Sequence, residues 1–491
     1  LPIWSHMANE NWCMIGYHSV SVLADAVAKG LPLDKEEVLK AMVSSSTIPY
    51  LDGTGEYMEK GYVALDHNGS AASLTLEYAY DDWTIYHTAL LAGNRSVADT
   101  YKKRAANYTN VFDTNMGYAR PRYADGRWKE NFNLLNTHGE GFIEGNALNY
   151  SFYVPQDVDN MIRLMGGDKS FVSKLDSLFT MHLPAEFFAQ TEDVTEEGLL
   201  GGYVHGNEPS HHIPFLYAWT SQPWKTQYWQ REIMNKMYRN NIDGLCGNDD
   251  CGQMSAWYIL SSMGFYPVCP GTDQYVLGAP YLPYMKVMLE NGKTFEVKAD
   301  KVSDKNRYVK SVKLNGKPYT KGFITQQDIM DGGTLTFEMT SSPNKKRVYS
   351  LREGVTDGRL WDCLHERGHF LFLVWAGFSL YIIQLEVLSN EFECSVSGGV
   401  CDFDGEEEFF GSGGVFLFRS RVCQSTLRSL KLKLVWNFLS VQRGRLFLRS
   451  LDRCCCRMRE RWSVWNMNLK KMCAARFIRT AAILCLGRFL Q

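Results

Sequence analysis

Proline is missing from the last part of the chain, because all 15 prolines lie at or before Pro343 although the chain has 491 residues. Acidic residues are scarce there as well: from residue 411 onward only Asp452 and Glu460 stand against 17 lysines and arginines. Cysteines are instead concentrated in the last part of the chain, with four before position 350 and nine after it. We therefore expect residues 347–491 to be an anomalous tail with no confident fold, disordered or non-native, from a shifted reading frame or a misassembled gene.

The net charge, the composition and the first residues of the chain each argue against a class of protein or segment. Its net charge of −2 argues against a general nucleic-acid binder. With 45% hydrophobic and 22% charged residues, it is not a disordered chain. No basic start followed by an apolar core opens the sequence, so no signal peptide is visible and we expect the chain to begin within a domain.

One apolar run, residues 370–385, is nearly uncharged but shorter than the roughly 20 residues of a bilayer span. A membrane anchor and a basic binding tail remain open as alternative interpretations of the tail. Neither has a steady hydrophobic period to support it, so we assign the tail no function and expect no membrane partner.

The earlier part of the chain has the periodicity of paired helices joined by long polar loops. This pattern predicts a mainly α protein, a toroid of helices whose loops at one end build the site. The pattern changes after Pro270 to period-2 alternation around Asn-Gly turns, which predicts β-hairpins. We expect a partial catalytic domain at 1–270 and a β-strand module at 271–346. The helical patterns lie at residues 15–29, 71–92, 97–112, 158–165, 170–179 and 254–263, with a further helix capped by Asp34.

Glu144 stands at a glycine-containing turn before an aromatic-rich segment with Tyr150, Phe152 and Tyr153. A carboxyl group near aromatic faces can hold its proton at neutral pH, because desolvation raises its pKa. Such a group could act as a general acid. The alternative is a glutamate that only caps a helix.

Residues 205–212 hold three histidines, an asparagine and a glutamate. They do not match the zinc motif HExxH, and Pro209 prevents a regular helix across them. The oxygens of Asn207 and Glu208 suit a hard cation such as calcium, and the imidazoles suit hydrogen bonds to sugar hydroxyls. A zinc site and a purely structural loop are the alternatives.

Asp249 and Asp250 lie in a glycine-flanked loop directly before a helix. Adjacent residues do not share a face, so one carboxylate can face a cleft while the other caps the helix or binds a metal ion or water. The alternative is that both are only N-cap charges. The flanking Cys246 and Cys251 could form a disulfide or remain thiols.

The segment before Trp83 places Asp81 and Asp82 beside Tyr80 and Trp83. Carboxylates with aromatic rings are a common means of holding sugars, although a helix with a polar face is the alternative. Taken together, separated acidic loops with aromatic walls on a helical toroid indicate glycoside hydrolysis, in which one carboxyl group protonates the leaving oxygen and a second carboxylate acts on water or carbon.

Four long segments closely resemble glycoside hydrolase family 92 in the family's order: ASLTLEYAYDDW, FIEGNALNYSFYVPQDV, HGNEPSHHIPFLY and GLCGNDDCGQMSAWYILSSMGFYPVCPG. The family comprises calcium-dependent exo-α-mannosidases with a β-sandwich followed by an (α/α)6 barrel. The resemblance covers roughly residues 3–345. It implies a partial (α/α)6 barrel with a small C-terminal β module, truncated at the N-terminus, and a tail unrelated to the family.

The resemblance also implies roles for individual residues and a substrate. The family inverts configuration, so Glu144 would be the general acid and Asp250 the general base, with Asp249 beside it. Mannose-containing glycans would be the substrates, in N-glycan degradation, and the location would be secreted or periplasmic. A catalytically inactive, mannose-binding remnant is the alternative. The residues implied in calcium and substrate binding are Asn207 and Glu208 for the metal, and Trp83, Asp82, His205, His211 and His212 for the sugar.

Overall fold

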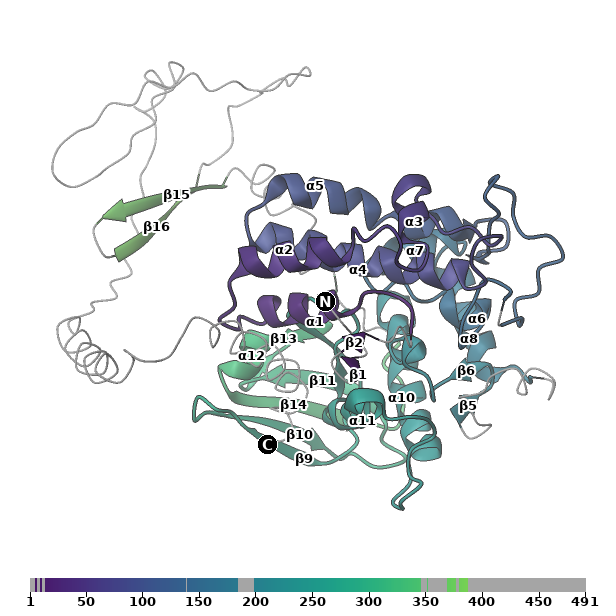
Figure 1. Ribbon diagram of the computed structural model, residues 1–491. Helices are drawn as coiled ribbons and strands as arrows, with labels where there is room; N and C mark the ends of the chain where they lie inside the picture. Colours follow the sequence, from purple (N-terminus) through teal and green to yellow (C-terminus); the bar gives the residue numbers. More distant parts are fainter. Residues whose placement is uncertain are drawn as a thin grey trace, which may run out of the picture. The chain divides into compact units, whose positions relative to one another are not determined.

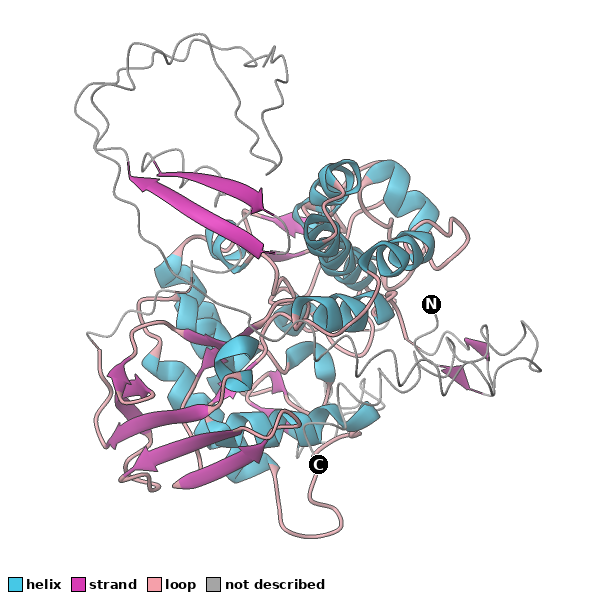
Figure 2. Ribbon diagram, turned by 90° about the vertical axis from the view of Figure 1, so that its left-hand side faces the viewer, coloured by secondary structure: helices cyan, strands magenta, loops and turns pink. Residues whose placement is uncertain are grey.

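The computed structural model describes residues 14–137, 139–183, 198–345 and 351, together with the backbone of strands at 5–6, 9–10, 369–376 and 379–386. The chain divides into two compact units, Leu1–Gly354 with Arg476–Gln491, and Val355–Ala475. Each unit is described by itself. In the first unit the helices of residues 19–104 lie towards one end and the larger sheet towards the other, with later helices beside that sheet (Figures 1 and 2).

A long buried helix organises the first part of the chain. Helix α4, Ala71–Leu91, is buried over most of its 21 residues, and α1, α2 and α5 pack around it (Figure 1). Its apolar residues form a stripe wide enough to meet neighbours on several sides. The helices of this layer are α1 (Ser19–Ala28), α2 (Lys35–Ser45), α3 (Thr54–Lys60), α4 and α5 (Arg95–Arg104).

Local signals fix where these helices begin. The Asp34 side chain accepts hydrogen bonds from the backbone N–H groups of Glu36 and Glu37, which starts α2 as predicted. Asn94 caps α5 in the same way, through the N–H of Val97. The helix expected at 97–112 is shorter than predicted: α5 ends at Arg104, and a 3-10 helix, η1 (Asn107–Val111), follows. In this 3-10 helix the Asn110 side chain donates a hydrogen bond to the Gly61 carbonyl. Such side-chain bonds to the backbone compete with a regular α-helix.

The second helical stretch alternates short helices with long loops. These loops carry most of the residues expected in the site, which agrees with their placement between helices of a toroid. Its helices are α6 (Ala147–Tyr150), α7 (Val158–Leu164), α8 (Asp168–Thr180), α10 (Trp224–Met237) and α11 (Gln253–Met263), with 3-10 helices η3 (Glu208–Ser210), η4 (Ile213–Trp219) and η5 (Asp250–Gly252). Two short hairpins lie between them, β3–β4 (Phe112–Asp113, Tyr118–Ala119) and β5–β6 (Leu199–Leu200, Tyr203–Val204).

Strands follow from Phe265 onward, close to the predicted change of pattern. A five-stranded sheet has the order β12-β11-β14-β10-β9, and a three-stranded sheet the order β13-β8-β7. Only β10 and β14 pair in parallel; the other pairs are antiparallel. The strands are β7 (Phe265–Tyr266), β8 (Gln274–Leu277), β9 (Tyr284–Met288), β10 (Thr294–Asp300), β11 (Tyr308–Leu314), β12 (Lys317–Pro318), β13 (Phe323–Thr325) and β14 (Gly333–Thr340), with α12 at Gln326–Met330.

The second of the two predicted Asn-Gly turns has the conformation of a two-residue hairpin loop, whereas in the first only Gly292 has positive φ. Asn315 and Gly316 both have positive φ, 51° and 78°, between β11 and β12. The β module is not isolated from the helices, because Met263 and Phe265 share its core with Phe295 and Phe337.

A clasp joins the start of the helical layer to the segment just before β8. Gly271 donates its N–H to the Asp25 carboxylate at 3.1 Å and accepts a hydrogen bond from the His87 ring at 2.9 Å. The Tyr80 hydroxyl donates to the Pro270 carbonyl at 2.8 Å. Residues 184 to 246 positions apart in the chain thus hold each other in place.

The second unit contains one described feature, an antiparallel hairpin of β15 (His369–Ala376) and β16 (Ser379–Glu386) in full register. The apolar run at 370–385 lies in these two strands. Among the described residues, no helix has both the length and the apolar character that a bilayer crossing requires. Leu351 is buried in the core of the helical unit, four residues beyond the expected start of the tail. The rest of the expected tail lies outside the described residues, so its origin stays a prediction.

Candidate active site

Three loops that the sequence singled out for chemistry meet around Glu208. Burial raises the pKa of this carboxyl group to about 7, and the charges of Asp250, Glu144 and Asp249 act in the same direction. A charge has such an effect only when it lies close to the group it perturbs. The geometry of the loops agrees: the Asn207 side chain donates to the Glu144 carbonyl, and the backbone of Gly247 lies against that of Gly206. The three loops therefore adjoin one another.

Glu144 occupies an unusual turn within this region. Its backbone has φ of +49°, a left-handed conformation that is costly for a residue with a side chain. The Asn207 side chain donates a hydrogen bond to the Glu144 carbonyl at 2.8 Å. The next residue, Gly145, lies against the Tyr150 ring, where an added Cβ would come within 3.2 Å of two ring carbons. The turn is thus held from two sides while its carboxyl group stays half-buried.

The two adjacent aspartates have different surroundings. Asp249 accepts hydrogen bonds from the N–H and hydroxyl of Ser255, at 2.9 and 2.8 Å, and its carbonyl accepts from the N–H of Gln253. Asp249 is therefore bound to the first turn of α11. Asp250 is exposed, and its carboxylate makes no hydrogen bond to the part of the chain that the structure describes. Of the two aspartates, Asp250 is thus the one whose carboxylate faces solvent.

Backbone strain marks both acidic loops. Six non-glycine residues of the described chain have positive φ, and two of them, Glu144 and Cys251, belong to these loops. Cys251 directly follows Asp250 and has φ of +56°. Such conformations persist where the surrounding structure enforces them, and they are frequent at functional sites.

Glu208 is the part of the site best suited to a cation. Its Oε1 atom is buried and finds no hydrogen-bond partner among the residues that the structure describes. A buried anionic oxygen without a partner is costly and requires a proton or a cation. Asn207 and Glu208 supply the amide and carboxylate oxygens that calcium prefers. Within the described ranges no group of three His, Cys, Asp or Glu residues could hold a metal ion, so side chains of these types would make only part of a ligand set.

The three histidines of the 205–212 loop belong to the framework around the site. His205 is fully buried, and its two ring nitrogens lie 2.8 and 2.7 Å from the hydroxyls of Tyr203 and Tyr238. His211 and His212 point Nε2 at the carbonyls of His205 and Phe152, at 2.9 and 2.7 Å. Burial lowers the pKa of all three rings, to about 4 for His211 and His212, which keeps them neutral.

Asp82 and Trp83 are also enclosed by protein. The Asp82 carboxylate is fully buried and accepts hydrogen bonds from the hydroxyls of Tyr17 and Tyr57 and from Arg104, all within 2.9 Å. Trp83 stacks on the His87 ring with centroids 5.4 Å apart. The polar side-chain atoms of Asp82, His205 and His211 already have protein partners, as does Nε2 of His212. The sugar contacts expected of these residues and of Trp83 stay a prediction.

Sequence reasoning gave no role to Tyr266, Glu77 or His18, and it named Tyr150 only as part of an aromatic-rich segment. Burial raises the pKa of the Tyr266 hydroxyl, and the charge of Glu208 adds to the effect. Tyr150 lies under Gly145, and its hydroxyl donates to Glu77, which the His18 ring also contacts. Tyr266 stands in the segment GFYPV. An aromatic residue in this family motif could have indicated that Tyr266 lines the site. Tyr150 and Glu77 are 73 residues apart in the chain. No pattern in the sequence around either residue could reveal that they pair.

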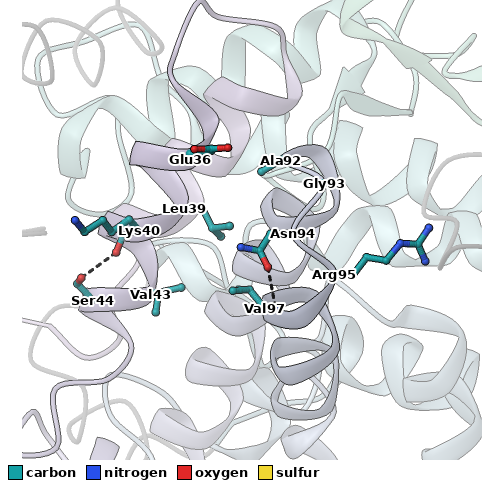
Figure 3. Close-up of a pocket in the computed structure, with 10 residues that line it drawn as sticks. All are labelled: Glu36, Leu39, Lys40, Val43, Ser44, Ala92, Gly93, Asn94, Arg95 and Val97. Atoms are coloured by element: carbon teal, nitrogen blue, oxygen red, sulfur yellow. Dashed lines mark hydrogen bonds between the residues drawn. The ribbon is translucent and has the colours of Figure 1, made fainter.

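The cavity drawn in Figure 3 lies elsewhere, between α2 and the junction of α4 with α5. Its volume is about 630 Å³, and its lining includes Leu39, Val43, Asn94 and Val97. None of the carboxylates around Glu208 lines it. Lys40 and Arg95 point away from each other in Figure 3, so the cavity has no converging charges.

Comparison with known proteins gives a consistent result. Residues 1–341 match the sequence model described as the glycosyl hydrolase family 92 catalytic domain. A secreted glycosidase of Arthroderma benhamiae, itself uncharacterized, is 26% identical over 65% of this chain and 44% of its own length.

Two solved structures from Bacteroides thetaiotaomicron are similar as well. The family GH92 α-mannosidase BT3965, in complex with mannoimidazole, is 39% identical over 75% of this chain and 51% of its own, with a TM-score of 0.68. The inverting mannosidase BT2199 is 35% identical over 70% of this chain and 48% of its own, with a TM-score of 0.63. The chain thus spans about half the length of these relatives.

Proposed function

The chain belongs to glycosyl hydrolase family 92, and on that premise we propose that it is an exo-acting α-mannosidase that hydrolyses terminal α-mannosides of glycans with inversion. The observation that carries the proposal is that the loop of Glu144 and the loop of Asp249 and Asp250 both contact the loop of Asn207 and Glu208. The charges of these three carboxyl groups also act on Glu208. The exposure of Asp250 and the partial burial of Glu144 support their assignment as base and acid. Relatives described as α-mannosidases, one of them inverting and one bound to a mannose-like inhibitor, support the substrate class.

In the proposed reaction Glu144 is the general acid and Asp250 the general base. Glu144 donates its proton to the glycosidic oxygen as the bond to the anomeric carbon breaks, and the leaving alcohol departs neutral. Asp250 takes a proton from a water molecule that attacks the opposite face of the sugar. Inverting enzymes hold the two carboxyl groups about 6.5–9.5 Å apart to leave room for that water. Asp249 stays hydrogen-bonded to Ser255 and positions the loop.

Asn207 and Glu208 would hold a calcium ion in this proposal. Their oxygens fit the ion, and the buried Oε1 of Glu208, surrounded by negative charge, supplies the reason for one. The bound ion would supply Lewis-acid stabilisation of substrate oxygens. The residues of the chain would bind and orient the sugar and protonate the glycosidic oxygen.

The proposed substrates are mannose-containing glycans, as in N-glycan degradation, and the proposed location is outside the cytoplasm, as for the secreted relative. The net charge of −2 gives no reason to add nucleic acid as a partner.

Hydrolysis of an aryl α-mannoside by the full chain tests the proposal, with proton NMR to follow the anomer released. We expect β-mannose as the first product, loss of turnover with EDTA and recovery with calcium. Glu144→Gln should lower kcat by about 10²- to 10⁴-fold, least with a good leaving group that needs little protonation. Glu140→Gln is the matched control, since Glu140 lies four residues away and pairs with Lys129; its kcat should stay within about twofold of the parent.

Two results would count against the proposal. Release of α-mannose first would exclude inversion. Mannose binding by calorimetry without any turnover would identify the chain as an inactive mannose-binding protein.

A further inference from the structure

His211 connects the loop of Glu208 to the helix that follows Asp250. Its Nε2 atom lies 2.9 Å from the His205 carbonyl, which can only accept a hydrogen bond. Nε2 therefore carries the proton of this neutral ring, and Nδ1 is left as an acceptor. The opposite assignment would set two acceptors against each other.

The partner of Nδ1 comes from the base loop. Gln253, the first residue of α11, places its Nε2 amide group 3.3 Å from His211 Nδ1. An amide N–H is a donor, so it matches the acceptor that the tautomer leaves. The backbone N–H of Gln253 also donates to the Asp249 carbonyl at 2.8 Å. One residue thus binds both the aspartate loop and the histidine.

A second bond makes the connection stiff. The indole N–H of Trp257, one turn further along α11, donates to the His211 carbonyl at 3.0 Å. The His211 backbone N–H donates to the Glu208 carbonyl at 3.1 Å. His211 and Trp257 are almost completely buried, so water does not replace these bonds.

We propose that His211 and Gln253 form a positioning link that holds the Asp250 loop in register with the Asn207–Glu208 turn. This inference rests on the proposed function for its catalytic consequence. It gives His211 a role without sugar contact, in keeping with its burial. Both residues act through the carboxylates that they position and touch no reacting atom. A shift of about 1 Å between groups that act on one substrate costs up to 10²-fold in rate, so the link has a measurable effect.

Gln253→Met tests the link in the full chain, because methionine keeps the length of the side chain and removes the N–H donor. Ser255→Ala is the matched control on the same helix, since it removes bonds to Asp249 and none to His211. Amide hydrogen exchange read by mass spectrometry reports on each loop separately. We expect Gln253→Met to speed exchange at least threefold in both 246–256 and 204–212, and Ser255→Ala to do so only in 246–256.

Turnover supplies the second readout. We expect Gln253→Met to lower kcat for an aryl α-mannoside by roughly tenfold with KM within twofold, as misplacement of a bound group predicts. Gln227→Met makes the same chemical change at the contact of α10 with β11 and should leave kcat unchanged.

Either of two results would overturn the link: exchange in Gln253→Met that rises only in 246–256, or a kcat equal to that of Gln227→Met. If the parent chain shows no turnover, the exchange result decides. Coupled exchange then supports the link while the proposed hydrolysis fails, so the two failures are distinguishable.

Discussion

At the scale of single residues, neighbours in sequence have separate tasks. Asp249 and Asp250 differ by one position, yet one is bound to α11 and the other is exposed. The sequence predicted that the two would face different ways, because adjacent residues do not share a face. Which of them caps the helix depends on Ser255, six residues away, and required the structure.

Asp250→Asn should therefore lower kcat about 10²- to 10⁴-fold with little change in thermal stability, because an exposed base is lost without a structural bond. Asp249→Asn should lower the free energy of unfolding by about 1 kcal/mol through the weakened helix start, with a smaller effect on kcat. Steady-state kinetics and thermal unfolding of both variants check this. Equal losses of kcat would show that Asp249 also acts on water.

His212 predicts how stability depends on pH. Its pKa falls from 6.5 in the unfolded chain to about 4 in the folded one. Between these values the unfolded chain binds more protons, so the stabilisation is complete above pH 6.5 and is lost as the pH falls towards 4. The loss amounts to about 3 kcal/mol at most.

Replacement of His212 by Gln isolates this contribution. We expect His212→Gln to be less stable than the parent at pH 7.5 by about 1 kcal/mol, through the weakened bond to Phe152, and to lose stability less steeply on acidification. Chemical unfolding at several pH values gives both quantities. Parallel curves for variant and parent would contradict the assignment.

At the scale of secondary structure, the strongest apolar patterns gave the right elements. The helices predicted at 15–29, 71–92 and 254–263 are α1, α4 and α11. The helix α10 was missed, because its buried face includes polar residues, among them Gln230 and Arg231, which donate to the distant Ala279 and Pro280 carbonyls. Periodicity registers burial only where the buried residues are apolar.

The turn that presents Glu144 depends on the start of α6. Gly145→Ala would place a methyl group 3.2 Å from the Tyr150 ring, closer than an ordinary contact, so the turn must shift by a few tenths of an ångström. We expect kcat to fall roughly tenfold, because Glu144, the proposed general acid, would be displaced. The control is Tyr150→Phe, which keeps the ring and loses the bond to Glu77, and it should change stability more than kcat. An unchanged kcat in Gly145→Ala would show that the turn tolerates the shift.

At the scale of the whole molecule, the described fold extends slightly beyond the change in composition. The sequence placed the start of the tail at residue 347, yet Leu351 is buried among the helices. Composition detects an average over many residues and cannot locate a single buried side chain. The family motifs, by contrast, could name the three loops of the candidate site, since each loop lies within one continuous segment. Their common meeting point at Glu208 is a property of the fold alone.

Leu351→Ala should lower the free energy of unfolding by about 2–4 kcal/mol, as expected for truncation of a buried leucine. Leu282→Ala is the matched control at a residue that is 42% exposed, with an expected change below about 0.5 kcal/mol. Denaturant unfolding of the two variants measures the difference. Equal stabilities would show that the core ends before residue 351.

The clasp of Asp25, Tyr80 and His87 on residues 270–271 has a consequence for how the protein is made. A ribosome exposes α1 and α4 long before it adds Gly271, so the first helices emerge without the groups that secure them. About 180 further residues are synthesised after His87 before residues 270–271 can bond to these helices. At ordinary synthesis rates this takes roughly ten to forty seconds. During that interval the N-terminal helices would be a natural client for a chaperone, and closure of the fold would be one of its last steps.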